Sequence, residues 1–167
     1  MITFTVYGVA SGMGSKRAFV PKGWKHPVIT DSNRNLKSWQ SLVADAASRA
    51  IAEHPDWKMF DGGVRLILTF YLPRPKSLAK KVTAHLKAPD CSKLIRSTED
   101  AMSGIVYRDD SQVVEVIAGK YYAGDQTSPH VNVRVEPTSG IVHYVTPPAS
   151  LPKGRSLLPF AMRTERP

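Results

Sequence analysis

The sequence predicts a single compact α+β domain in which two helices pack on a mixed β-sheet. Two stretches carry apolar residues at the spacing of a helix, residues 39–51 and 94–102. Four other stretches have the alternation or the β-branched composition of strands: residues 2–7, 64–72, 112–118 and 130–135. The length of 167 residues is enough to bury one substantial core but not two.

The charge balance indicates a polyanionic partner. Lys and Arg number 23 against 14 Asp and Glu, which gives a net charge of +9. Nucleic acid is the commonest partner of such a protein, although a basic surface without a polyanion partner is the alternative. The single cysteine, Cys91, cannot form an internal disulfide, which is typical of a reducing cytoplasm. No segment approaches the length of about 18 apolar residues that a membrane helix needs, so we expect a cytoplasmic protein without membrane contact.

The N-terminal region predicts a strand followed by a basic loop. Residues 2–7 alternate apolar and polar side chains, and Gly8 ends the run. Between residues 16 and 37 basic side chains alternate with Phe19 and Trp24, and such a loop can bind phosphates and stack on unpaired bases. The alternative is an ordinary hairpin with Trp24 packed on the core. The candidate DNA-binding residues in this region are Lys16, Arg17, Lys22 and Lys25.

The middle of the chain predicts core elements and a second basic segment. The apolar stripe from Trp39 to Ile51 predicts a buried helix face, which His54 and Pro55 end, and we assign no chemistry to it. Residues 64–72 predict a central strand. The following segment, residues 74–87, is either a solvated helix face or a rim that guides a phosphodiester backbone. Its candidate DNA-binding residues are Lys76, Lys80, Lys81 and Lys87.

The segment from residue 89 to 116 carries the candidate chemistry. Asp90 opens a short amphipathic helix, Gly104 turns the chain, and Asp109 and Asp110 follow a short extended run. A helix of about a dozen residues advances about 18 Å, and six extended residues return over about 20 Å. We therefore expect Asp110 to lie beside Asp90. The alternative is a helix N-terminal residue and an unrelated polar turn.

Two neighbouring carboxylates would favour a hard divalent cation. They repel each other, and one of them would take up a proton unless positive charge lies between them. Mg²⁺ or Mn²⁺ binds a few carboxylate oxygens, keeps several waters and completes its shell with substrate phosphate. The pattern therefore predicts hydrolysis of a phosphodiester in a basic, nucleic-acid-binding protein.

The same segment resembles the RusA family of Holliday-junction resolvases, whose signature combines P-D-x-D-[NK]-L, D-A-[LM], G-[IV]-x-Y and D-D-[SA]-Q-V-V. The matching residues are Pro89, Asp90, Lys93, Leu94, Asp100, Ala101, Met102, Gly104 to Tyr107, and Asp109 to Val114. The resemblance covers about residues 1–136. It implies a homodimeric, Mg²⁺-dependent endodeoxyribonuclease that resolves four-way DNA junctions by paired nicks, which leave 5′-phosphate and 3′-hydroxyl ends.

The resemblance also implies which residues act. The catalytic aspartates fall on Asp90 and Asp110, Asp109 is a further candidate metal ligand, and the helix lysine of the family falls on Arg96. Lys93 is a further candidate for stabilising charge on the phosphate. Ser92 stands where the signature has its second aspartate.

Ser92 leaves three functional interpretations open. Ser92 is a good N-cap for the helix, but its presence removes one anionic ligand from the predicted cation site. Asp100 lies about 12 Å along the helix, so it cannot replace that ligand, and we expect it to form an ion pair with a neighbouring Arg or Lys. The protein is thus a junction-resolving nuclease, a junction-binding protein that does not cut, or a single-strand-binding module that uses residues 16–37.

The C-terminal part predicts two strands and an extension. Residues 112–118 carry apolar side chains on both faces, which is typical of an interior strand or of one at a subunit interface. Residues 130–135 alternate as a last core strand. Residues 137–167 are rich in Pro and Ser, and apart from a short strand at 141–145 we expect them to be partly disordered or to wrap the partner subunit.

Overall fold

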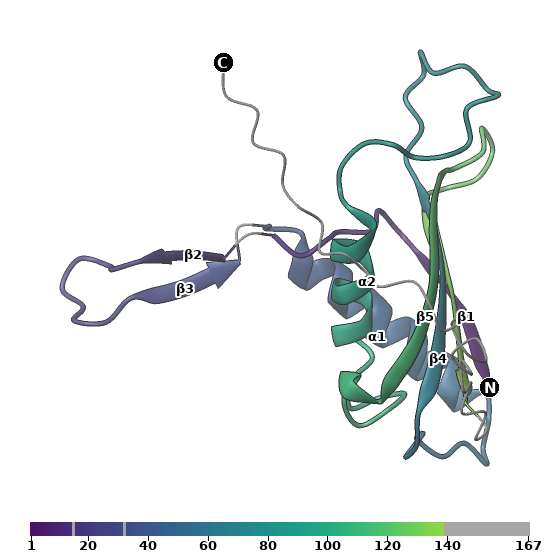
Figure 1. The fold of residues 1–167 in the computed structure, drawn as a ribbon, viewed down its shortest axis with the longest axis horizontal. Helices are drawn as coiled ribbons and strands as arrows, with labels where there is room; N and C mark the ends of the chain where they lie inside the picture. Colours follow the sequence, from purple (N-terminus) through teal and green to yellow (C-terminus); the bar gives the residue numbers. More distant parts are fainter. Residues whose placement is uncertain (15, 32, 139–167) are drawn as a thin grey trace, which may run out of the picture.

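The computed structural model describes residues 1–138 apart from residues 15 and 32, and the side chains of residues 16, 17 and 29–31 are likewise outside the description. Within this range the predicted α+β domain is confirmed (Figure 1). The predicted C-terminal extension and its strand at 141–145 lie outside the described residues. No helix among the described residues is long and apolar enough to cross a membrane.

The core of the fold is a mixed sheet of four strands. Its order is β1 (Ile2–Tyr7), β6 (His130–Pro137), β4 (Val64–Leu72) and β5 (Val113–Tyr122). Strand β6 is antiparallel to both of its neighbours, whereas β4 and β5 are parallel. Strand β4 is interior, as predicted. Strand β5 is an edge strand of the described sheet, so the interior interpretation of residues 112–118 is wrong for this chain.

Two helices, α1 (Leu36–Ala52) and α2 (Cys91–Asp100), cover one face of the sheet (Figure 1). On β4 every second side chain faces them and is buried, from Val64 to Leu72, because side chains of a strand alternate between its two faces. The indole nitrogen of the buried Trp39 donates a hydrogen bond to Thr98 Oγ1 at 3.3 Å, which ties α1 to α2. The apolar stripe of α1 is confirmed, except that Leu42 is 42% exposed.

A two-stranded hairpin, β2 (Lys16–Phe19) and β3 (Val28–Asp31), projects away from the sheet and the helices (Figure 1). Trp24, in the loop that joins the two strands, is 63% exposed, so the alternative in which it packs on the core is wrong. Phe19 and Val20 are also more than half exposed. The hairpin therefore presents aromatic and basic side chains to solvent.

The lysine-rich segment after β4 is a loop of turns, so the predicted helix face for residues 74–87 is wrong. Arg74 shapes this loop, because its guanidinium donates hydrogen bonds to the carbonyl oxygens of Ala79, Val82 and Ala123. Pro73 and Pro75 at its start cannot donate backbone hydrogen bonds, which disfavours a helix there. The loop extends beyond one end of the sheet (Figure 1).

Candidate functional site

Helix α2 begins at Asp90, which is its N-cap in extended conformation. The amide of Leu94 donates to the carbonyl oxygen of Asp90 at 3.2 Å, and this is the first turn of the helix. The prediction that Ser92 is the N-cap is therefore wrong, because Ser92 already lies inside the first turn. The carboxylate of Asp90 makes no capping hydrogen bond and lies 3.7 Å from Lys93 Nζ at the surface. Both Asp90 and Ser92 are thus exposed at this end of the helix.

The chain between β1 and the hairpin packs directly on this end of α2. The amide of Met13 donates to the carbonyl oxygen of Lys93 at 3.1 Å. A Cβ on Gly12 would lie 3.0 Å from Lys93 Cβ and 3.3 Å from Pro89 Cβ, so a larger residue would have to displace α2. Asn33, on the other arm of the hairpin, donates to Gly12 O at 2.7 Å. These contacts fix the base of the hairpin beside Asp90.

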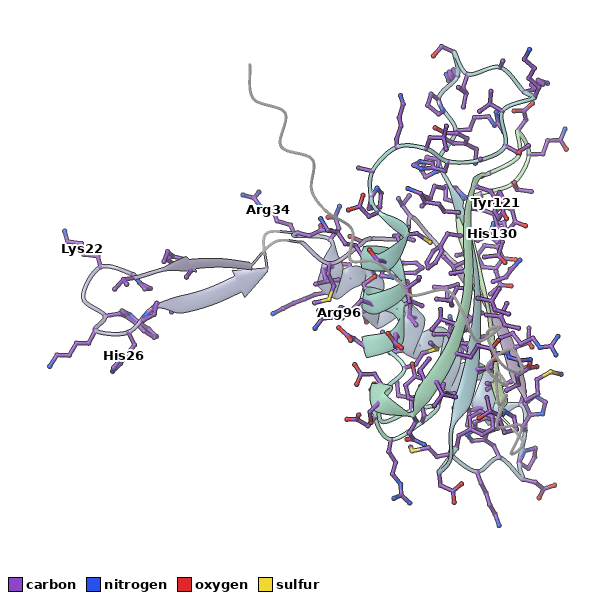
Figure 2. The ribbon with its side chains drawn as sticks, viewed as in Figure 1. Lys22, His26, Arg34, Arg96, Tyr121 and His130 are labelled. Carbon is purple, nitrogen blue, oxygen red and sulfur yellow. The ribbon has the colours of Figure 1, made fainter. Side chains whose placement is uncertain are left out.

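A cavity of about 430 Å³ lies where these elements meet. It is lined by Met13, Gly14, Ser92, Lys93 and Arg96. Two cationic side chains, a hydroxyl and the positive end of the α2 dipole all meet there. Such a combination favours an anion of phosphate size. Figure 2 shows Arg96 and the projecting hairpin together.

Asp110 lies at the opposite end of α2, where it begins the short helix η1 (Asp110–Gln112). It lies near Asp100, and the described residues form no ion pair with Asp100 within 4 Å, so the ion pair predicted for Asp100 is wrong. Burial raises the pKa of Asp100, and Arg96 partly offsets this effect. Burial also raises the pKa of Glu99, and the negative charges of Asp110 and Asp100 raise it further. Three carboxyl groups therefore lie together at this end.

The expectation that one chain brings Asp110 beside Asp90 is wrong. The ten-residue helix α2 separates the two residues, and it is about 15 Å long at about 1.5 Å per residue. The return leg was expected to be extended, but residues 101–107 form a compact turn. The amides of Ile105 and Val106 both donate to Met102 O, and Gly104 has a φ of 76°. The chain therefore stays at the C-terminal end of α2.

Strand β5 makes the return instead, and Lys120 near its end reaches the Asp90 loop. Lys120 Nζ donates hydrogen bonds to the carbonyl oxygens of Lys87 and Pro89, both at 2.7 Å. Pro89 immediately precedes Asp90. Sequence reasoning missed this role, although a lone lysine among the helix-facing apolar residues of a strand was a signal that could have indicated it.

Asp109 has a structural role in the turn that carries Asp110. Its carboxylate accepts a hydrogen bond from the amide of Ser111 at 2.9 Å. The side chain of Ser111 first, and this amide second, lower the pKa of Asp109. Gln112 accepts from the amide of Asp109 and donates to the carbonyl oxygens of Phe60 and Gly62. The D-D-S-Q pattern thus anchors the start of β5, and metal binding by Asp109 stays a prediction.

The described part of one chain holds no group of three or more His, Cys, Asp or Glu side chains that could bind a metal ion. Glu115 does not add to the Asp110 cluster, because it pairs with Arg65 at 2.6 Å. A single chain therefore does not fit the predicted cation site. The candidate ligands Asp90 and Asp110 are present, but they lie at separate ends of α2.

The candidate DNA-binding residues fall into two separate regions. Lys22 and Lys25 are exposed on the loop of the hairpin, beyond Lys16 and Arg17 in β2 (Figure 2). The other residues are exposed in the loop that follows β4, namely Lys76, Lys80, Lys81 and Lys87. Of these, Lys80 pairs with Asp125 at 2.7 Å. Lys87 belongs to the Asp90 loop that Lys120 holds.

Comparison with known proteins identifies the family of this chain. The family described as Endodeoxyribonuclease RusA matches residues 13–136, which include both ends of α2, the hairpin and β5. The chain therefore belongs to the RusA endodeoxyribonuclease family, as its motifs predicted, and membership supports a junction-resolving endonuclease. The chain is also similar to "Uncharacterized protein YqaN" of Bacillus subtilis (strain 168). The two are 28% identical over an alignment of 148 positions, and the alignment covers 83% of this chain and 97% of that protein.

Proposed function

We propose that this protein is a Mg²⁺-dependent endodeoxyribonuclease, with Mn²⁺ as a possible substitute, that resolves four-way DNA junctions by paired symmetric nicks as a homodimer. The observation that carries the proposal is the family match over residues 13–136, together with the basic cavity at Ser92, Lys93 and Arg96. That cavity lies directly beside the exposed carboxylate of Asp90. Its recombination or repair substrate would be met in the cytoplasm of a bacterial or phage-infected cell.

The separation of Asp90 from Asp110 supports a site that two chains share. The two residues lie at opposite ends of α2. A two-fold axis through the middle of a pair of antiparallel α2 helices would bring Asp90 of each chain to Asp110 of the other. Two such sites would form in every dimer. This symmetry matches a four-way junction, in which two strands of like polarity are cut.

Strand β5 supports the position of that axis. It is an edge strand of the described sheet, so the outer row of its backbone donors and acceptors has no strand beside it. The exception is its end, where residues 83–85 pair with residues 120–122. Val114, Val116 and Ile117 on this strand are 65%, 40% and 50% exposed. Pairing of β5 with β5 of a second chain would bury this apolar surface. It would also set the two α2 helices antiparallel to each other.

The chemistry that we propose needs both ends of α2. Asp90 and Asp110, with Asp109 as a further candidate, would hold the cation between the chains. When bound, a divalent cation supplies Lewis acidity, which activates water and polarises the scissile phosphate. Lys93 and Arg96 contribute positive charge at the cavity, where negative charge develops on the phosphoryl oxygens. The hairpin and the lysines of the loop after β4 hold the DNA arms through their phosphates.

A second candidate function is junction binding without cutting. Ser92 is exposed beside the cavity and is not needed to cap the helix, so an aspartate there would face the proposed cation. With serine, the site has one anionic ligand fewer. Loss of one ligand weakens cation binding, while the basic surfaces for DNA stay in place. A third candidate is a single-strand-binding module that uses the exposed Trp24 and the lysines of the hairpin.

Cleavage of a synthetic four-way junction with Mg²⁺ or Mn²⁺ separates these functions. Nicking that is lost in Asp90→Asn and in Asp110→Asn, and retained in the exposed α1 control Asp45→Asn, supports the nuclease. Tight, structure-selective binding without nicks supports the second candidate. Equal affinity for a junction and for a single strand supports the third and contradicts the other two.

Mixing the two inactive variants tests the shared site. In a dimer of one Asp90→Asn chain and one Asp110→Asn chain, one shared site carries both substitutions and the other carries neither. With random exchange of subunits, about a quarter of the wild-type sites return. We therefore expect the mixture to recover single nicks. A mixture that stays as inactive as its components contradicts the two-chain site.

A further inference from the structure

A row of four aromatic rings crosses the open face of the sheet. The rings are Tyr7 on β1, His130 on β6, Tyr71 on β4 and Tyr121 on β5. The strand register aligns them, because Tyr7 and Tyr71 are both partners of His130, and Tyr71 is the partner of Tyr121. We call these four residues the ring row. It lies on the face of the sheet opposite α1 and α2, and Figure 2 marks His130 and Tyr121.

The rings form a nearly continuous aromatic surface. The centroids of Tyr71 and His130 are 4.6 Å apart with their planes at 23°, which is a stacked pair. Tyr7 is 6.0 Å from His130, and Tyr121 is 6.1 Å from Tyr71. The outer rings are the accessible ones, since Tyr7 is 70% and Tyr121 is 41% exposed. The row therefore offers ring faces and edges to a flat ligand.

Two of the rings are held in place by their surroundings. The ring of Tyr121 lies over Gly119, where an added Cβ would come within 2.8 Å of the Tyr121 ring and its hydroxyl. The Nδ1 of His130 is 2.8 Å from the carbonyl oxygen of Ser128, and only the nitrogen can donate in that pair. Because these rings are already positioned, a ligand that stacks on them needs little side-chain ordering.

Polar and cationic groups continue the surface at one end of the row. A hollow of about 450 Å³ beside Tyr7 and His130 is lined by the amide and hydroxyl side chains of Thr5, Gln126, Thr127 and Asn132. A neighbouring cavity of about 380 Å³ shares Thr127 and is lined by Lys76 and by the ion pair of Lys80 with Asp125. Amides and hydroxyls can hydrogen-bond base edges, and lysines attract phosphates.

We infer that the ring row binds unpaired DNA nucleotides, with bases stacked on Tyr7 and Tyr121 and phosphates drawn towards Lys76. A sheet that stacks bases on aromatic side chains is an established way to bind single strands. The rest of the open face disfavours a protein partner, because Arg65 and Arg134 are ion-paired there with Glu115 and Glu136. The inference does not rest on the proposed nuclease site, which lies on the other face of the sheet.

Binding of a labelled twelve-nucleotide oligothymidine, followed by fluorescence anisotropy at fixed salt, tests the ring row. We expect Tyr7→Ala and Tyr121→Ala each to weaken binding about tenfold, the loss that corresponds to one stacked base. Tyr7→Phe and Tyr121→Phe retain the rings and should retain the affinity. Ile67→Ala, which removes apolar surface from the same face on the central strand β4 without removing a ring, should leave the affinity unchanged.

Three results would overturn the inference. In the first, the double Tyr7→Ala and Tyr121→Ala variant is folded by circular dichroism and binds the oligonucleotide like the wild type. In the second, the Phe variants lose as much affinity as the Ala variants, so that the hydroxyls and not the rings matter. In the third, the Ala variants change the sedimentation of the protein alone, which assigns the face to a second copy. The Ala variants should not affect nicking of a fully paired junction. A failure of the nuclease proposal can therefore be distinguished from a failure of the ring-row inference.

Discussion

Lys120 on β5 holds the loop that carries Asp90 through Pro89, whose carbonyl oxygen accepts a hydrogen bond from Lys120 Nζ at 2.7 Å. The same ammonium group also binds the carbonyl oxygen of Lys87 at 2.7 Å. One charged side chain thus connects the sheet to the two residues that lead into α2. The position of Asp90 therefore depends on β5, the strand that begins just after Asp110.

We predict that Lys120→Met lowers both stability and nicking. A hydrogen bond from a charged group contributes about 1.5–3 kcal/mol, but one of the two bonds of Lys120 is exposed and the other is only partly buried, so water competes for both. The free energy of unfolding should therefore fall by about 1–3 kcal/mol when methionine retains the apolar packing. A loop displaced by about 1 Å can reduce a rate by about a hundredfold. Urea unfolding and single-turnover junction cleavage measure the two effects.

The exposed Lys58→Met is the matched control for Lys120→Met, because it removes the same charge from the loop between α1 and β4, which holds none of the candidate DNA-binding residues. It should alter neither the free energy of unfolding nor the single-turnover rate by much. If Lys120→Met reduces junction affinity and leaves the single-turnover rate unchanged, Lys120 is a DNA contact and does not position Asp90.

We predict that acid destabilises the protein through His85. This side chain is 7% exposed, packs on Tyr122 with centroids 4.5 Å apart, and its Nδ1 has no hydrogen-bond partner among the described residues. Burial lowers the pKa of His85 below 6.5, and the charge of Lys120 lowers it further. Below an unfolded-state pKa of about 6.5 the unfolded chain therefore binds more protons than the folded chain, and stability falls as the pH falls.

Replacement of His85 by Phe should flatten this pH dependence. Urea unfolding of wild type and His85→Phe at pH 5 and pH 7.5 measures the difference, since phenylalanine cannot take up a proton but can still pack on Tyr122. His26, which is exposed, provides the control His26→Phe. Equal pH dependence in wild type and His85→Phe would show that His85 does not contribute to acid sensitivity.

Tyr107 should stabilise the turn that carries Asp110. The side chain is fully buried, and its hydroxyl donates to the carbonyl oxygen of Glu99 at 2.8 Å, across the turn. Tyr107→Phe leaves that carbonyl without its partner, so we expect the free energy of unfolding to fall by about 1 kcal/mol. Thermal or urea unfolding measures this. Tyr7→Phe is the control at an exposed tyrosine, and a Tyr107→Phe protein as stable as wild type would contradict the role.

The elements of the fold were predictable because their apolar patterns are local. Residues 2–7 alternate apolar and polar side chains, and residues 64–72 are rich in β-branched and aromatic side chains. Residues 39–51 place their apolar side chains on one stripe of a helix. The placement of Asp110 was not predictable in the same way. It depends on whether residues 105–107 are extended or turned, and hydrogen bonds to Met102 decide that choice.

Other parts of the site depend on contacts between distant segments. Asn33 reaches Gly12 across the hairpin, and Lys120 reaches Pro89 across 31 residues. The ring row depends on the strand order, which places His130 between Tyr7 and Tyr71. No local pattern carries this information, whereas the motif around Asp90 identified the end of α2 at which the basic cavity lies.

We predict that Ser92→Asp raises the rate of junction cleavage or shifts the metal preference from Mn²⁺ towards Mg²⁺. Ser92 lines the cavity with Lys93 and Arg96, and its hydroxyl does not cap α2. An aspartate there adds a hard oxygen ligand at the proposed cation site, and Mg²⁺ depends more than Mn²⁺ on such ligands. The negative charge near the N-terminus of α2 should also raise stability by about 0.3–1 kcal/mol.

Junction cleavage in Mg²⁺ and in Mn²⁺, measured for wild type and Ser92→Asp, tests this prediction. Ser38→Asp is the matched control, because Ser38 is an exposed serine in the first turn of α1 and gains the same charge away from the cavity. The control should gain stability without any change in cleavage. If Ser92→Asp changes only the stability, position 92 takes no part in cation binding. In that case the serine at position 92 cannot be the reason for weak cleavage by the wild type.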